Sequence, residues 1–119
     1  MDTRKYGRVG EEFAISFLQK AGYKILEKNF RSYVGEIDII ALSPPKFETL
    51  VFVEVKTRWS KKFGAPEDAV TPRKLWHIKR TGEYYLLKNP GLPKKIRIEV
   101  VAIEIAGGRV TSAKIIKAD

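Results

Sequence analysis

The chain has 119 residues, 44% hydrophobic and 31% charged, and this composition predicts one globular domain over residues 1–119. It has no cysteine, no apolar secretory signal and no apolar run near the roughly 20 residues of a membrane-spanning helix, which argues against disulfides, thiol catalysis and membrane insertion and predicts a cytoplasmic location. Lys and Arg number 23 against 14 Asp and Glu, so the net charge of +9 favours a nucleic-acid partner through counterion release.

The first predicted element is an amphipathic helix over residues 6–21. Its apolar side chains recur at three- and four-residue steps, and Gly22 provides a C-terminal stop. The apolar stripe consists of Tyr6, Val9, Phe13, Ala14, Phe17, Leu18 and Ala21. Glu11 lies at the flank of this stripe, so its carboxylate can reach whatever the helix packs against.

Three strands are predicted next. Residues 23–27 form a short strand, residues 29–35 a connection, and residues 36–42 a second strand that ends before a pair of prolines. Residues 50–56 are mostly apolar on both faces, which is typical of a central strand. The second and third strands are predicted to form an antiparallel hairpin.

The second half of the chain begins with a segment that has no clear periodicity, residues 57–73, and we expect a mobile basic surface loop there. A helix over residues 71–89 then begins with a hydroxyl cap and a proline. Residues 96–105 and 109–116 predict two strands joined by a Gly-Gly turn. The whole order predicts a mixed α/β fold in which helices flank a central five-stranded sheet.

Two carboxylates and a lysine are placed to meet on this sheet. Alternation along the third strand puts Glu54 and Lys56 on one face at its C-terminal end. A hairpin would return the chain so that Asp38 lies at the same edge of the sheet. Carboxylate oxygens at such a point suit Mg²⁺, and Lys56 would orient water and offset phosphate charge.

A simpler interpretation of these residues is structural. Glu54 and Lys56 could form an exposed ion pair, with Asp38 as a charge at a strand end. The functional interpretation is favoured because the acid and the lysine follow an apolar strand, where a charge on the buried side is unfavourable unless a metal or partner uses it. Glu36 shares a face with Asp38, and either a metal-linked role or simple solvation would explain it.

The chain also contains four longer motifs. They are Gly10-Glu11-x-x-Ala14-x-x-Phe17-Leu18, Asn29-Phe30-Arg31, Gly35-Glu36-Ile37-Asp38-Ile39-Ile40-Ala41 and Val51-Phe52-Val53-Glu54-Val55-Lys56-Thr57-Arg58. With these motifs the chain resembles the YraN-like family of small bacterial proteins. That family belongs to the PD-(D/E)xK superfamily, which has the restriction-endonuclease-like fold, and it is similar to archaeal-type Holliday junction resolvases. The similarity continues to residue 103 and covers most of the chain.

The resemblance implies a metal-dependent endonuclease that acts on DNA rather than RNA, including branched or structured DNA. It makes Asp38 and Glu54 the ligands of Mg²⁺ or Mn²⁺, and Lys56 the catalytic lysine. Glu11 would add a helix-borne acid to the same site. A homodimer is a further expectation, because resolvases work as dimers.

Two positions depart from the family pattern. Ile37 stands where the superfamily name has Pro, which is common in diverged members. Glu99, after Arg97, stands where the family is expected to have Asp, so no role is carried over to that position.

Basic and aromatic residues after the third strand suit a loop that grips phosphates and stacks on unpaired bases. The candidate nucleic-acid contacts are Arg58, Trp59, Lys61, Lys62, Arg73 and Lys74. Packing of an aromatic side chain in the core and solvation of the helix face are the alternatives. His77 has no second His or Cys to complete a metal site, so we expect a structural or surface role.

Two other functions remain compatible with the sequence. One is a catalytically weak or inactive nucleic-acid-binding module on the same fold, since fold alone does not establish activity. The other is a basic protein whose charge serves heat stability and which acts as a protein partner. A nuclease needs divalent metal, whereas a protein partner would show no salt-dependent affinity for nucleic acid.

Overall fold

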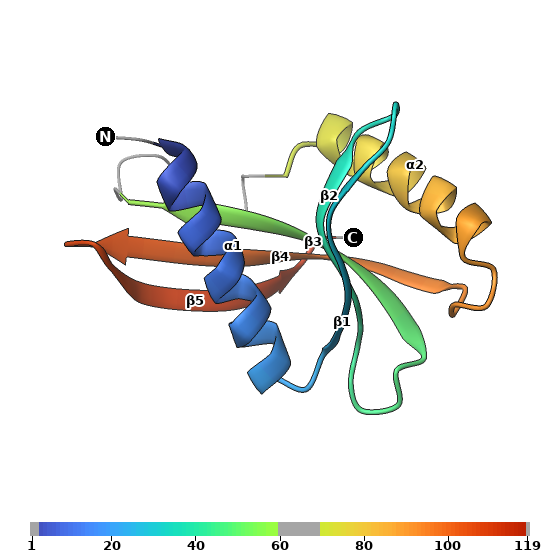
Figure 1. The fold of residues 1–119 in the computed structure, drawn as a ribbon, viewed down its shortest axis with the longest axis horizontal. Helices are drawn as coiled ribbons and strands as arrows, with labels where there is room; N and C mark the ends of the chain where they lie inside the picture. Colours follow the sequence, from blue (N-terminus) through green and yellow to red (C-terminus); the bar gives the residue numbers. More distant parts are fainter. Residues whose placement is uncertain (1–2, 60–69, 119) are drawn as a thin grey trace.

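The computed structural model describes residues 3–59 and 70–118, in which a five-stranded mixed sheet is flanked by two helices (Figure 1). The predicted fold class is therefore confirmed. The elements in chain order are α1 (Thr3–Lys20), β1 (Lys24–Arg31), β2 (Glu36–Leu42), β3 (Thr49–Arg58), α2 (Pro72–Lys88), β4 (Lys95–Ala106) and β5 (Arg109–Lys117). None of the described helices is both long and apolar enough to cross a membrane.

The strands lie in the sheet in their order along the chain, β1-β2-β3-β4-β5. Neighbouring strands are antiparallel except for β3 and β4, which are parallel. Parallel neighbours need a crossover connection, and α2 lies in the connection between these two strands. The predicted antiparallel hairpin of β2 and β3 is confirmed, and it brings the ends that carry Asp38 and Glu54 together.

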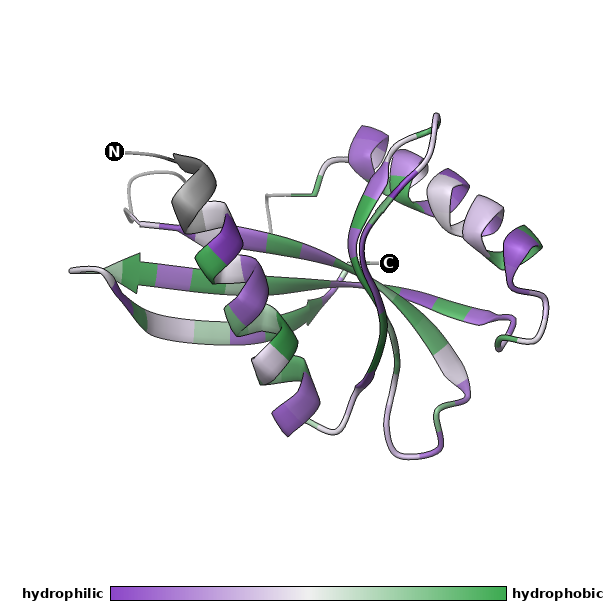
Figure 2. Cartoon of the chain, in the orientation of Figure 1, coloured by the Kyte–Doolittle hydropathy of each residue, from purple (hydrophilic) through white to green (hydrophobic). Residues whose placement is uncertain are grey.

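Two apolar clusters hold the helices to opposite faces of the sheet. Ala14 and Leu18 of α1 are buried against one face, with residues such as Val53. Ile78 and Tyr85 of α2 are buried against the other face. Figure 2 shows hydrophobic segments in the central strands, whereas much of α2 is hydrophilic. Burial of these stripes is the main force that fixes both helices.

Three predicted details are wrong: the ends of two strands and one residue of the apolar stripe of α1. β1 continues to Arg31, because residues assigned to a connection pair with the start of β2. β3 continues to Arg58, which was predicted as loop, because its ladder with β4 runs on to Glu104. Val9, placed in the apolar stripe of α1, is 44% exposed. Residues 60–69 of the predicted loop lie outside the described residues.

A close approach between α2 and β3 fixes the height of the helix above the sheet. A Cβ atom on Gly82 would overlap the ring of Phe52, which is fully buried. Alanine normally favours a helix by about 1 kcal/mol over glycine, but overpacking outweighs this gain. We therefore expect Gly82→Ala to lower the free energy of unfolding by about 1–2 kcal/mol in urea titration.

The control for this prediction is Gly91→Ala, because a Cβ atom at Gly91 meets nothing within 4 Å. Equal stability of the two variants would contradict the close packing of α2 on Phe52.

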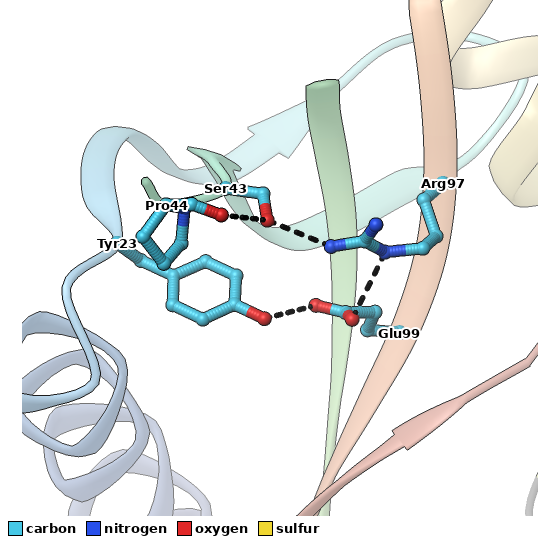
Figure 3. A network of polar contacts seen from close by, with 5 residues as sticks. All are labelled: Tyr23, Ser43, Pro44, Arg97 and Glu99. Atoms are coloured by element: carbon cyan, nitrogen blue, oxygen red, sulfur yellow. Dashed lines mark hydrogen bonds and ion pairs between the residues drawn. The ribbon is translucent and has the colours of Figure 1, made fainter. Parts of the chain in front are cut away.

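A buried polar network braces the end of the sheet at which β3 begins (Figure 3). The Tyr23 hydroxyl donates to Oε1 of Glu99 at 2.8 Å, and Nε of Arg97 donates to Oε2 of the same carboxylate at 3.0 Å. Arg97 also donates to the Ser43 hydroxyl at 2.8 Å. Glu99 is only 2% exposed, and both of its carboxylate oxygens accept hydrogen bonds within the network, so this departure from the family pattern has a structural role.

Candidate functional site

The hairpin of β2 and β3 opens at Asp38. Backbone pairing between the two strands runs to Ile39 opposite Val53. Beyond that pair, the N–H of Val55 donates to Oδ2 of Asp38 at 2.7 Å. A side-chain carboxylate thus accepts the hydrogen bond of a backbone N–H at this point, and the Asp38 carboxyl group is held against β3.

Asp38 has two other carboxylates near it, those of Glu54 and Glu11. Burial, together with the neighbouring carboxylates of Glu54 and Glu11, raises the pKa of Asp38 to about 7, although the Val55 N–H and Lys74 act to lower it. A carboxyl group with like charges around it in a partly buried place is poised to accept a proton or a cation.

Glu54 continues the face of β3 that carries Phe52, and it is buried on the side of α2. Its side chain is 8% exposed, and Nζ of Lys74 lies 2.5 Å from its Oε1. Burial works against the charge of Lys74, but Glu54, Asp38 and Glu36 outweigh it and raise the pKa of Lys74. Lys74 is therefore an ammonium group that neutralises the Glu54 carboxylate from the first turn of α2.

An open cleft of about 980 Å³ lies on the other side of Asp38. Residues of α1, of the end of β1, of β2 and of the end of β3 line it, together with the residue after β3. They are Gly7, Arg8, Glu11, Glu12, Ile15, Lys28, Asn29, Arg31, Asp38, Val55, Lys56, Thr57 and Trp59. The cleft thus combines the carboxylates of α1 and Asp38 with four cationic side chains, and Lys56 is one of these.

A second close approach brings α1 to this cleft. A Cβ atom on Gly10 would overlap the hydroxyl of Thr57, so only glycine lets the helix lie so near the end of β3. Glu11 follows directly and lines the cleft together with Asp38. The glutamate predicted to flank the apolar stripe is therefore at the site.

The donor set at this site fits a hard divalent cation in its chemistry. Asp38 and Glu54 supply carboxylate oxygens, and their mutual repulsion would be relieved by a cation between them. Mg²⁺ is usually held by one or two carboxylates, with water and phosphate completing its shell. Within residues 3–59 and 70–118, no group of three or more His, Cys, Asp or Glu side chains forms a ready-made metal site.

The predicted nucleic-acid contacts are in different places. Trp59 is 44% exposed and lines the cleft. Arg73 is exposed on the first turn of α2, where Lys74 instead pairs with Glu54. Arg58 is largely buried and lies 3.6 Å from Glu104. Lys61 and Lys62 lie outside the described residues.

Sequence reasoning missed three cationic side chains of the cleft, namely Arg8, Lys28 and Arg31. Two of them belong to the part of β1 that was predicted to be at or beyond the end of the first strand. The motif Asn29-Phe30-Arg31 contains one of them, Arg31. Its place at the rim of the cleft could be recognised only from the pairing of β1 with β2.

The sequence model of uncharacterised protein family UPF0102 matches residues 10–103. A UPF0102 protein of Syntrophomonas wolfei subsp. wolfei is 44% identical over 98% of each chain. Another, from Caldicellulosiruptor saccharolyticus, is 47% identical over 87% of this chain and 85% of its own, and one from Dictyoglomus thermophilum is 42% identical over the same shares. The chain therefore belongs to the uncharacterised protein family UPF0102, the YraN-like family whose motifs it carries.

Proposed function

We propose that this protein is a metal-dependent endonuclease that hydrolyses phosphodiester bonds in DNA. The observation that carries the proposal is the pair of carboxylates, Asp38 and Glu54, at the point where β2 and β3 separate, next to a cleft lined by Lys56. The resemblance to PD-(D/E)xK nucleases assigns these same three residues to metal binding and catalysis. The net charge of +9 adds attraction for a polyanion.

Each residue would have a distinct task. Asp38 and Glu54 would hold Mg²⁺ or Mn²⁺, which when bound supplies a Lewis acid and activates water. The Val55 N–H fixes Oδ2 of Asp38 and so orients the carboxyl group. Lys56 would hold the attacking water and offset the charge that develops on the phosphate. Glu11 would extend the acidic centre from α1.

The basic rim would position the DNA. Arg8, Lys28 and Arg31 line the same cleft as Asp38, and cations at these positions would bind phosphates of the DNA backbone. Arg31 lies 3.3 Å from Glu36, and both side chains are exposed, so this pair is weak and the guanidinium can turn to a phosphate.

The test is to incubate the purified protein with linear duplex, single-stranded, branched and RNA substrates, with and without Mg²⁺ or Mn²⁺. We expect cleavage of DNA only with metal. Asp38→Asn and Lys56→Ala should each reduce cleavage by about 100-fold or more while binding is retained. Glu48→Gln, which removes one exposed charge far from the site, is the matched control.

A catalytically weak nucleic-acid-binding module is the second candidate. It is favoured by the Lys74 ammonium, which already neutralises Glu54. It is also favoured because the described residues contain no group of three or more His, Cys, Asp or Glu side chains that could hold a metal ion. On this alternative, no metal concentration produces cleavage, and both Asp38→Asn and Lys56→Ala keep the function of the protein. Binding that is insensitive to salt would exclude both candidates.

A further inference from the structure

Four side chains of α2 that lie outside its buried stripe are spaced four residues apart and form a row: Trp76, Arg80, Tyr84 and Lys88. Residues at this spacing are neighbours on a helix surface, so aromatic rings and cations alternate along the row. Cζ of Arg80 lies 5.3 Å from the Trp76 ring centre, and Nζ of Lys88 lies 4.8 Å from that of Tyr84. We call these four residues the α2 row.

The tip of the β1–β2 hairpin adds a fifth side chain. Tyr33 is 91% exposed, and its ring lies 5.9 Å from that of Tyr84 at 83°. The hairpin is fixed on α2, because Nδ1 of His77 is 3.2 Å from the carbonyl oxygen of Val34. Figure 1 shows the hairpin rising beside α2. Tyr33 and the α2 row therefore form one surface built from two joined elements.

Packing in the core does not explain the exposure of two of these rings. Trp76 is 52% exposed and Tyr33 is 91% exposed, whereas Tyr84 is half-buried and also contacts Phe30. Exposed aromatic faces with cations between them match a ligand that has both flat rings and negative charge. The acidic side chain next to the row is Glu83, which lies 3.5 Å from Arg80, and this exposed pair is weak.

We propose that Tyr33 and the α2 row bind a single-stranded segment of nucleic acid, with bases stacked on Trp76 and Tyr33 and phosphates near Arg80 and Lys88. The inference rests on the proposed function, because it takes nucleic acid as the partner. The row begins two residues after Lys74, which contacts Glu54. The favoured substrate is then DNA with unpaired nucleotides next to the cleaved strand, as at a branch or a flap.

The experiment measures binding in EDTA, so that it does not depend on cleavage. The probes are a labelled DNA single strand of about 15 nucleotides and a duplex of the same length and sequence. We expect the double variant Tyr33→Ala/Trp76→Ala to bind the single strand roughly 10- to 100-fold more weakly, with a change of less than about twofold for the duplex. Leu87→Ala, an 82% exposed apolar residue on the same helix, should bind both probes as the unmodified protein does.

Two further measurements separate stacking from a general loss of structure. Tyr33→Phe/Trp76→Phe keeps the rings and should restore single-strand affinity. The chain has two tryptophans, so Trp59→Phe leaves Trp76 as the sole one, and its emission should be quenched by the single strand. Unchanged single-strand affinity in the alanine variant, or an equal loss for both probes, would overturn the proposal. Tight single-strand binding through these rings without any cleavage would contradict the nuclease proposal but not this one.

Discussion

Asp38→Asn is expected to be more stable than the unmodified protein at pH 8 in the absence of metal, by about 2–3 kcal/mol. The reason is that burial, together with Glu54 and Glu11, raises the pKa of Asp38 to about 7 from 3.8. At pH 8 the folded protein must therefore hold an ionised carboxylate in an unfavourable place. Asparagine removes that charge, and its amide oxygen can still accept the Val55 N–H.

The effect has a defined pH window. Below about pH 4, Asp38 is protonated in both the folded and the unfolded chain, so no buried charge lowers the free energy of unfolding and the contribution of the neutral carboxyl group to stability is fully present. Between about pH 4 and pH 7 the unfolded chain ionises first, so the free energy of unfolding falls as the pH rises. The advantage of Asp38→Asn should therefore be absent near pH 4 and complete above pH 7.

Urea unfolding at pH 4, 6 and 8 measures this difference, with Glu48→Gln as the control for loss of one negative charge. If the difference in the free energy of unfolding between Asp38→Asn and the unmodified protein is the same at all three pH values, then Asp38 does not lie in a crowded acidic site. Divalent metal gives a second measurement. Mg²⁺ or Mn²⁺ should raise the melting temperature of the unmodified protein at pH 8 and leave that of Asp38→Asn unchanged.

The sheet could be predicted from sequence because its signals are local. The run from Leu50 to Val53 is buried on both faces, as its continuous apolar character predicts. Glu54 continues the face of Phe52, as simple alternation requires, and the hairpin with β2 is the shortest way to pair two neighbouring strands. The approach of Asp38 to Glu54 follows from that hairpin alone.

The details of the site depend on contacts that no local pattern contains. Ile37 and Ile40 both belong to the cluster under α2, whereas Ile39 belongs to the cluster under α1, so alternation fails across Asp38. The break coincides with the point at which the Asp38 carboxylate accepts the Val55 N–H. It follows that Asp38 faces the cleft while Glu54 lies under α2, a division that the sequence did not reveal.

The basic rim was underestimated for a similar reason. Lys28 and Asn29 are exposed polar residues on an edge strand, and such residues look like a loop when one sequence is considered alone. Pairing with Ile39 and Ile37 turns this stretch into β1. Phe30 then packs edge-on against Tyr85 of α2, with ring centres 4.9 Å apart, and this contact anchors the strand.

Lys74→Met is expected to have the opposite sign to Asp38→Asn. It leaves the Glu54 carboxylate, whose side chain is 8% exposed, without its ammonium partner. We expect the free energy of unfolding at pH 8 without metal to fall by about 2 kcal/mol, less than for fully buried pairs, because the Lys74 side chain is 42% exposed. Urea unfolding measures the change, and Lys74→Arg, which keeps the positive charge, should recover most of the loss.

The same variant distinguishes two roles for this lysine. If Lys74 holds the position that a metal ion takes when the site is loaded, Lys74→Met removes a competitor, and Mg²⁺ or Mn²⁺ should stabilise it more than they stabilise the unmodified protein. If Lys74 only neutralises Glu54 in a site that never binds metal, neither ion will restore the lost stability. Both results are read from melting temperatures without any substrate, so they decide whether Glu54 is a metal ligand independently of nuclease activity.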